Sequence, residues 1–133
     1  MPPRILAVDH HHETLDVVAT VLTLRGYWVA VASDGASAIS ASKHCEPDLL
    51  LLDITLRDMS GVTVLQTVRG LGLTSAAVAL TALAFETDKR TDRDAGFDAV
   101  CAKPADVEHL LRILRNLVAP RLGLAAFHGP HVS

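Results

Sequence analysis

Four polar side chains, each placed directly after a short apolar run, have the types that phosphoryl transfer requires. They are Asp9, Asp53, Thr81 and Lys103. Transfer of a phosphoryl group depends on positioning and on neutralisation of negative charge more than on elaborate covalent machinery. A carboxylate can act as the nucleophile and form an aspartyl phosphate. The residue types therefore predict a phosphoryl-transfer site in which Asp53 is the acceptor.

Such a site needs positive charge, because two neighbouring carboxylates repel each other. Lys103 supplies one positive charge, and a hard divalent ion such as Mg²⁺ can supply the rest through oxygen ligands. The alternative is that one of the two carboxylates is protonated.

Five apolar runs predict the strands that position these side chains. The runs are continuous rather than alternating, which is typical of parallel strands that are covered on both faces. They are Ile5–Val8, Tyr27–Ala32, Leu49–Leu52, Ala76–Leu80 and Ala99–Ala102. The four candidate residues would all lie at carboxyl ends of strands, where open α/β sheets bind their ligands.

Helix-period segments alternate with the strands. Five are predicted: Leu15 to Gly26, Ala36–His44 with Asp34 as its cap, Val62 to Arg69, Phe85 to Ala95, and Val107 to Val118. Strict alternation of strand and helix implies a doubly wound parallel sheet with right-handed crossovers. In the flavodoxin-like strand order 2-1-3-4-5, Asp9 would lie beside Asp53.

Composition predicts one globular domain. Half of the 133 residues are hydrophobic, and we expect a domain over residues 1–119 with a flexible tail over 120–133.

The net charge of −3 is the opposite of the positive charge that favours binding to nucleic acid, so we expect no nucleic-acid partner for this domain. The apolar runs are too short for a membrane helix, and the chain starts without a secretory signal. With two cysteines and no disulfide framework, a cytoplasmic location is expected.

Five segments of the sequence resemble the receiver domains of bacterial response regulators, in the same order and spacing. They are residues 5–9 (ILAVD), 48–61 (DLLLLDITLRDMSG), 79–82 (ALTA), 96–99 (GFDA) and 103–104 (KP). The resemblance runs from about Arg4 to Val118. It implies that Asp53 accepts a phosphoryl group from a histidine kinase or a phosphotransfer domain. A downstream protein partner would then respond to the phosphorylation state of the domain.

The resemblance also implies roles for the neighbouring residues. Metal contacts would come from the carboxylates of Asp9 and Asp53 and from the backbone carbonyl of Thr55. Phosphate contacts would come from Thr81 and Lys103, with a cis peptide bond before Pro104. Such a protein is a signalling phosphoacceptor, and its only catalysis is its own phosphorylation and dephosphorylation.

Three positions depart from the receiver pattern. His10 replaces a second acidic metal ligand, so His10 itself is a candidate ligand, and Mn²⁺ or another divalent ion becomes an alternative to Mg²⁺. Val100 replaces the aromatic residue that usually moves inward on phosphorylation. Arg57 replaces a common proline in the loop after Asp53.

These departures leave alternatives open. A degenerate pseudo-receiver, acting as a protein-interaction module without phosphorylation, is the main one. A haloacid-dehalogenase-type phosphatase is disfavoured because Asp53-Ile54-Thr55 lacks the second aspartate of its Asp-x-Asp motif. A flavodoxin is disfavoured because no Ser/Thr/Gly-rich phosphate loop follows the first strand. The triplet at 10–12 fits either a solvated turn, which is favoured, or a site for zinc, copper or nickel.

Overall fold

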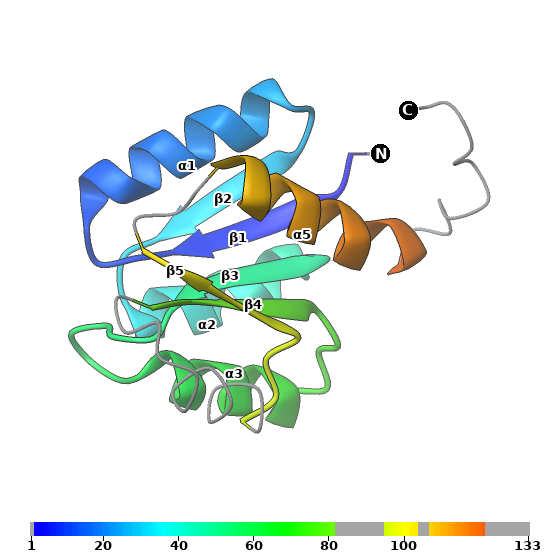
Figure 1. Ribbon diagram of the computed structural model, residues 1–133. Coiled ribbons are helices and arrows are strands. Elements are labelled where there is room, and N and C mark those ends of the chain that lie inside the picture. Colours follow the sequence, from blue (N-terminus) through cyan, green and yellow to red (C-terminus); the bar gives the residue numbers. More distant parts are fainter. Residues whose placement is uncertain (1, 82–94, 104–106, 122–133) are drawn as a thin grey trace.

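A five-stranded parallel sheet forms the centre of the molecule (Figure 1). We analysed a computed structural model, which describes residues 2–81, 95–103 and 107–121. The strand order is β2-β1-β3-β4-β5, as predicted. The strands are β1 (Arg4–Val8), β2 (Trp28–Ala32), β3 (Leu49–Asp53), β4 (Ala76–Thr81) and β5 (Ala99–Ala102).

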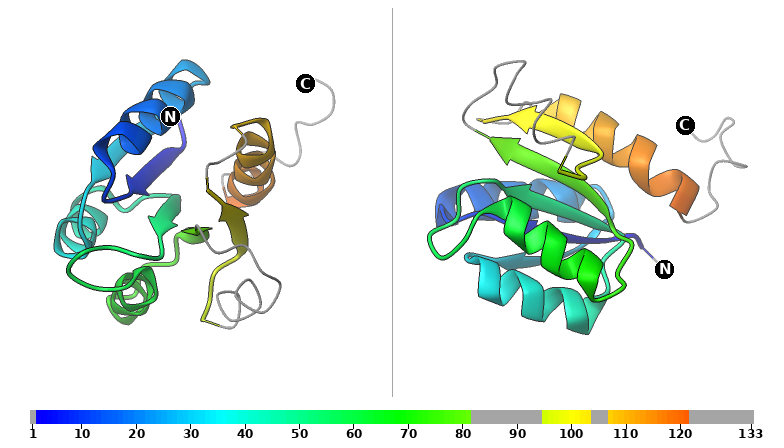
Figure 2. Two further views of the ribbon diagram at one scale, coloured as in Figure 1. Left: turned by 60° about the vertical axis from the view of Figure 1, so that its left-hand side comes forward. Right: turned by 90° about the horizontal axis from the view of Figure 1, so that it is seen from below.

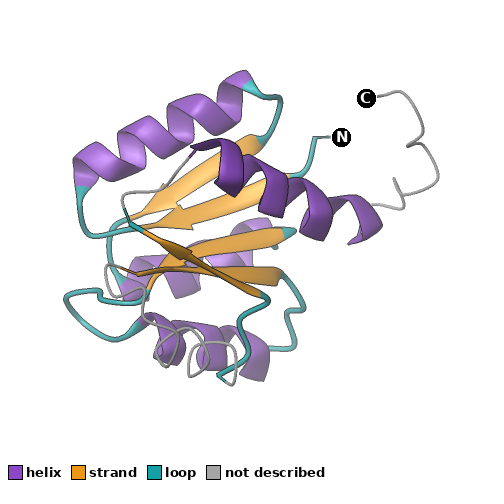
Figure 3. Cartoon of the chain, in the orientation of Figure 1, coloured by secondary structure: helices purple, strands orange, loops and turns teal. Residues whose placement is uncertain are grey.

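Helices cover both faces of this sheet. In the described residues they are α1 (His12–Leu24), α2 (Gly35–Cys45), α3 (Gly61–Gly70) and α5 (Val107–Arg121). Helices α1 and α5 lie on one face, and α2 and α3 lie on the other (Figures 2 and 3). The predicted cap is confirmed, since the Asp34 carboxylate accepts a hydrogen bond of 2.7 Å from the Ser37 amide.

Each face of the sheet has its own buried cluster of apolar side chains. Leu49 and Leu51 of β3 belong to the cluster under α1 and α5, whereas Leu50 and Leu52 belong to the cluster under α2 and α3. This division follows from the strand, in which successive side chains point to opposite faces. The continuous leucine run is therefore explained by a central strand that is covered on both sides.

Strand β2 departs from the prediction that every strand is covered on both faces. Trp28 and Val31 are exposed, at 44% and 52% of their surface. The reason is topological, because β2 is the edge of the sheet and pairs only with β1 among the described strands. An apolar run alone does not distinguish an edge strand from a central one.

Some predictions concern residues outside the described part. Residues 85–94 of the helix expected at 85–95 and the cis peptide bond before residue 104 both fall there, as does the segment 122–133 of the expected tail. Helix α5 continues to Arg121, two residues past the expected end of the domain at 119. In the described ranges, no helix has the length and apolar character that crossing a membrane demands.

Candidate functional site

The predicted site residues gather at the carboxyl edge of the sheet. Parallel registry brings the strand ends together, with Val8 opposite Leu52 and Thr81 opposite Ala102. Asp9 follows β1 and Lys103 follows β5, whereas Asp53 and Thr81 are the last residues of β3 and β4. Both carboxylates are almost completely buried.

Lys103 bridges the two carboxylates. Its Nζ lies 2.7 Å from Asp9 Oδ2 and 3.3 Å from Asp53 Oδ2. The backbone amide of Lys103 also donates a 2.8 Å hydrogen bond to the carbonyl of Thr81, which fixes the end of β5 against β4. The predicted group of two acids, a hydroxyl-bearing residue and a lysine is therefore built from four adjoining strand ends.

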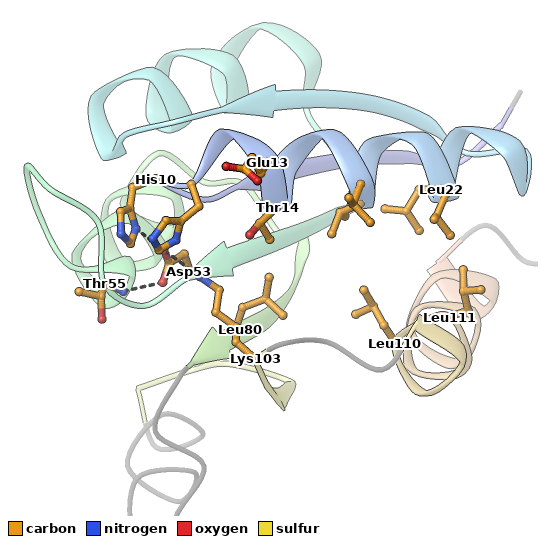
Figure 4. A pocket seen from close by; sticks show the side chains of 14 residues that line it. His10, Glu13, Thr14, Leu22, Asp53, Thr55, Leu80, Lys103, Leu110 and Leu111 are labelled. Carbon is orange, nitrogen blue, oxygen red and sulfur yellow. Dashed lines mark hydrogen bonds and ion pairs between the residues drawn. The ribbon is translucent and has the colours of Figure 1, made fainter.

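The imidazole of His10 points into this site (Figure 4). Its Nδ1 lies 2.7 Å from Asp53 Oδ2 and donates a hydrogen bond to it when the carboxylate is ionised. The same nitrogen lies 3.9 Å from Asp9 Oδ1. The side chain that replaces the expected second acid thus contacts the candidate acceptor directly.

The environment of Asp53 favours its charged form. Burial raises its pKa, but the Thr55 amide, the His10 ring and the Lys103 ammonium together outweigh burial and hold the pKa below its ordinary value. The Thr55 amide donates a 2.9 Å hydrogen bond to Oδ1. At neutral pH Asp53 is a carboxylate, which is the form required of a nucleophile.

The loop from β3 to α3 is held tightly beneath the site. The Gly61 amide donates a 2.8 Å hydrogen bond to the carbonyl of Ile54, and Thr55 pairs with Ser60 in an antiparallel bridge. A Cβ on Gly61 would lie 2.6 Å from the carbonyl oxygen of Asp53, so only glycine fits this approach. Gly61 is therefore a positioning residue for the candidate acceptor.

Sequence reasoning missed Asp58 near the site, and it named His11 only as a member of the histidine triplet. Asp58, in the same loop, accepts hydrogen bonds from the amides of Gly35 and Ala36 at 2.7 and 3.0 Å and so ties the loop to the start of α2. His11 lies beside Asp9, with its Nδ1 3.4 Å from Asp9 Oδ1. The histidine triplet signalled His11, but the link from Asp58 to α2 depends on a loop conformation that residue types do not specify.

A cavity of about 780 Å³ opens beside the strand ends, between α1 and α5 (Figure 4). Its polar end is formed by residues of the site, including His10, Asp53 and Lys103. Its apolar end includes Val21 of α1 and Leu110 of α5. The acceptor carboxylate therefore borders this cavity.

The residues of the site fit a divalent cation only in part. Two buried carboxylates, Asp9 and Asp53, offer the hard oxygen ligands that Mg²⁺ prefers. At position 10, however, an imidazole stands where an oxygen ligand is expected. Among the described residues, ligand atoms of Asp9, His10 and His11 all lie within 4.8 Å of one another.

Comparisons with known proteins agree with this architecture. The family model of the response regulator receiver domain matches residues 5–115. The chain is 36% identical over 126 residues to the transcriptional regulatory protein KdpE of Mycobacterium tuberculosis, covering 95% of this chain and 55% of that protein. It is also 36% identical over 130 residues to the dual master transcriptional regulator RpaA of Synechocystis, covering 95% of this chain and 54% of the relative.

A solved structure agrees over almost the whole chain. The CheY-like receiver domain protein of Methanospirillum hungatei superposes with a TM-score of 0.85 at 26% identity, covering 92% of this chain and 98% of that one. The chain spans about half the length of the curated relatives it matches. On the family match and on the sheet order, the chain belongs to the response regulator receiver domains, whose family function is to accept phosphoryl groups in two-component signalling.

Proposed function

We propose that Asp53 is the phosphoacceptor of this domain and receives its phosphoryl group from a phosphohistidine of a histidine kinase or a phosphotransfer domain. The observation that carries the proposal is the contact of the Asp53 carboxylate with Lys103, at 3.3 Å, inside a pair of buried acids. In the transfer step, an oxygen of Asp53 bonds to phosphorus. The bond from phosphorus to the donor imidazole breaks, and the imidazole nitrogen keeps the electron pair.

The neighbouring residues would act by positioning and by charge. Lys103 already lies within 3.3 Å of the acceptor and would contact an oxygen of the incoming phosphoryl group. The Thr81 hydroxyl, at the end of the adjoining strand β4, would donate a second hydrogen bond to the phosphoryl group. The Thr55 amide holds Asp53 Oδ1 and so orients the other oxygen toward the donor.

A divalent cation is part of the proposal. Asp9, Asp53 and the Thr55 backbone carbonyl would hold Mg²⁺, with His10 as a further contact that admits Mn²⁺ as well. When bound, the ion would neutralise charge that Lys103 alone does not balance.

The domain would act as a switch in a relay rather than on a substrate of its own. Self-catalysed loss of the phosphoryl group to water would reset it, and Asp53 borders the adjoining cavity from which water would come. We propose residues 1–119 as the switching unit, followed by the tail 120–133, with a protein partner as its downstream target. The net charge of −3 favours a protein over nucleic acid as that target.

A pseudo-receiver is the second candidate, and one contact favours it. The His10 ring lies 2.7 Å from Asp53 Oδ2 and so shields one oxygen of the acceptor. In this alternative the domain binds its partner in a single state, and phosphate donors leave it unmodified.

Intact mass measured after incubation with acetyl phosphate and Mg²⁺ distinguishes the two candidates. We expect the wild-type protein and the control Asp16→Asn, which removes an exposed carboxylate of α1, to gain one phosphoryl group. Asp53→Asn should gain none. Equal labelling of Asp53→Asn would refute the assignment, and an unlabelled wild type would favour the pseudo-receiver.

A further inference from the structure

Three metal-binding side chains meet at the start of α1, next to the acceptor carboxylate. They are Asp9, His10 and His11, and each offers a ligand atom within 4.8 Å of the others. They differ in burial: Asp9 is buried, the His10 side chain is 19% exposed and the His11 side chain is 61% exposed. The cluster is thus anchored in the site at one end and open to solvent at the other, which gives an ion a way in.

The distance between His11 and Asp9 matches the spacing of two ligands around one small ion, and His10 lies slightly farther away. Two ligands at about 2.0–2.1 Å from a tetrahedral metal lie about 3.3–3.4 Å from each other. His11 Nδ1 lies 3.4 Å from Asp9 Oδ1, and His10 Nδ1 lies 3.9 Å from the same oxygen. To reach the same spacing, His10 Nδ1 would give up its hydrogen bond to Asp53 Oδ2 and move about half an ångström closer to Asp9 Oδ1.

The carboxylate is already oriented for this role. Lys103 holds Asp9 Oδ2 at 2.7 Å, which leaves Oδ1 directed toward the two histidines. The backbone amide of His11 donates a 2.9 Å hydrogen bond to Oδ1 and fixes it beside the His11 ring. Such outer contacts orient metal ligands and contribute to affinity.

The donor set selects the class of ion. Two imidazole nitrogens and one carboxylate oxygen suit Zn²⁺, with water in the fourth position, whereas Mg²⁺ prefers an octahedron of oxygens. We propose that Asp9, His10 and His11 form a zinc-type transition-metal site. We further propose that zinc excludes Mg²⁺ and so inhibits phosphorylation of Asp53, because Asp9 would be a ligand of either ion. The binding part stands on the cluster alone, and the inhibition part rests on the proposed function.

Zinc affinity of the purified wild-type protein, measured at pH 7.5 by competition with a chromogenic chelator, tests the binding part. We expect one Zn²⁺ per chain, bound more tightly than Mg²⁺ because two of the three ligands are imidazoles. Asp9→Asn and His11→Gln should each weaken zinc binding by about tenfold or more, since even outer-shell partners are worth about 10–100-fold.

His12→Gln is the matched control, because His12 is an exposed member of the same triplet but lies outside the cluster. It should bind zinc like the wild type. If zinc were instead bound by the three consecutive histidines without Asp9, the pattern would be the opposite. The zinc affinity of His12→Gln would then fall as much as that of His11→Gln, and the zinc affinity of Asp9→Asn would be unchanged. That pattern, or a wild type that binds no zinc, would overturn the proposal. Circular dichroism of each variant checks that it is folded.

Zinc titrated into the acetyl phosphate reaction at fixed Mg²⁺ tests the inhibition part. Each variant is compared with its own zinc-free labelling. We expect zinc to suppress labelling of the wild type and of His12→Gln, and to do so at about tenfold higher concentration in His11→Gln. Labelling of the wild type that persists at saturating zinc would refute inhibition. A wild type that is unlabelled without zinc would refute the proposed function, while the binding measurement would still decide the metal site.

Discussion

At the scale of single residues, position 10 sets the charge of the site. Asp9, Asp53 and Lys103 together leave one net negative charge, to which a neutral His10 adds nothing. An acid at this position would add a second negative charge and a hard oxygen ligand. His10 therefore lowers both the repulsion within the metal-free site and its attraction for a hard cation.

His10→Asp should consequently bind Mg²⁺ more tightly than the wild type, by about fivefold or more, because one added charge at about 4 Å is worth at least about 1 kcal/mol even in water. Isothermal titration calorimetry with Mg²⁺ measures the difference. His12→Asp is the control, since it adds the same charge on the exposed first residue of α1. If His10→Asp binds Mg²⁺ no more tightly than the wild type, the side chain at position 10 is not a metal ligand.

The sequence allowed only part of this arrangement to be predicted. Asp9, Asp53 and Lys103 could be placed together because strand ends of a parallel sheet meet at one edge. The direction of the histidine rings could not, because it depends on side-chain torsions in the turn before α1. The solvent exposure expected for the triplet holds for His12, which is however the first residue of α1, but not for His10, which contacts Asp53 at 2.7 Å.

At the scale of elements, the β3–α3 loop holds the acceptor in place. Its two ends are tied to the neighbouring structure, through Gly61 against the end of β3 and through Asp58 against the start of α2. Strand and helix positions followed from apolar periodicity, but this loop has no such pattern. Its conformation comes from individual backbone and side-chain hydrogen bonds.

Gly61→Ala should destabilise the fold by about 1–3 kcal/mol, the usual cost of forcing extra volume into a packed site. The added Cβ would lie 2.6 Å from the carbonyl oxygen of Asp53, and backbone must move to relieve it. Urea denaturation measures the loss. Gly70→Ala is the matched control, because a Cβ there meets nothing within 4 Å, and alanine should be neutral or stabilising. Equal effects of the two substitutions would contradict the close approach at Gly61.

Asp58 should make stability depend on pH. Hydrogen bonds from the amides of Gly35 and Ala36 hold its pKa below the ordinary value of 3.8. Its contribution is therefore fully present above pH 3.8 and is lost as the pH falls through the lower value of the folded protein. Asp34 caps the same end of α2 through the Ser37 amide, and a substitution of Asp58 leaves this capping residue unchanged.

The midpoint of thermal unfolding tests this dependence. Asp58→Ala should unfold at a lower temperature than the wild type at pH 7, and the difference should shrink as the pH is lowered below 3.8. Asp16→Asn, in α1, controls for the loss of an exposed carboxylate. A difference for Asp58→Ala that is unchanged at low pH would show that the charge of Asp58 does not stabilise α2.

At the scale of the whole molecule, the site lies at the edge shared by two separate apolar clusters. Asp53 ends β3, whose side chains alternate between the cluster under α1 and α5 and the cluster under α2 and α3. The acceptor therefore lies next to both faces of the sheet. Val100 of β5 is buried in the second cluster, where the receiver pattern has an aromatic residue.

Val100 restricts how a phosphorylation signal can leave the site. Its side chain is short and β-branched, with one stiff torsion, so it cannot couple phosphate capture by Thr81 to the rotation of a large ring. We expect the signal to travel through displacement of the loops and through residues 85–95, of which 85–94 lie outside the described part of the chain. Backbone amide shifts with and without beryllofluoride, a phosphoryl mimic, test this route. Shifts should extend from the loops at Asp53 and Thr81 into residues 85–95, and Asp53→Asn should show none of them. Shifts confined to the loops that touch the mimic would mean that no long-range switch operates, because a partner bound elsewhere would then meet the same surface in both states.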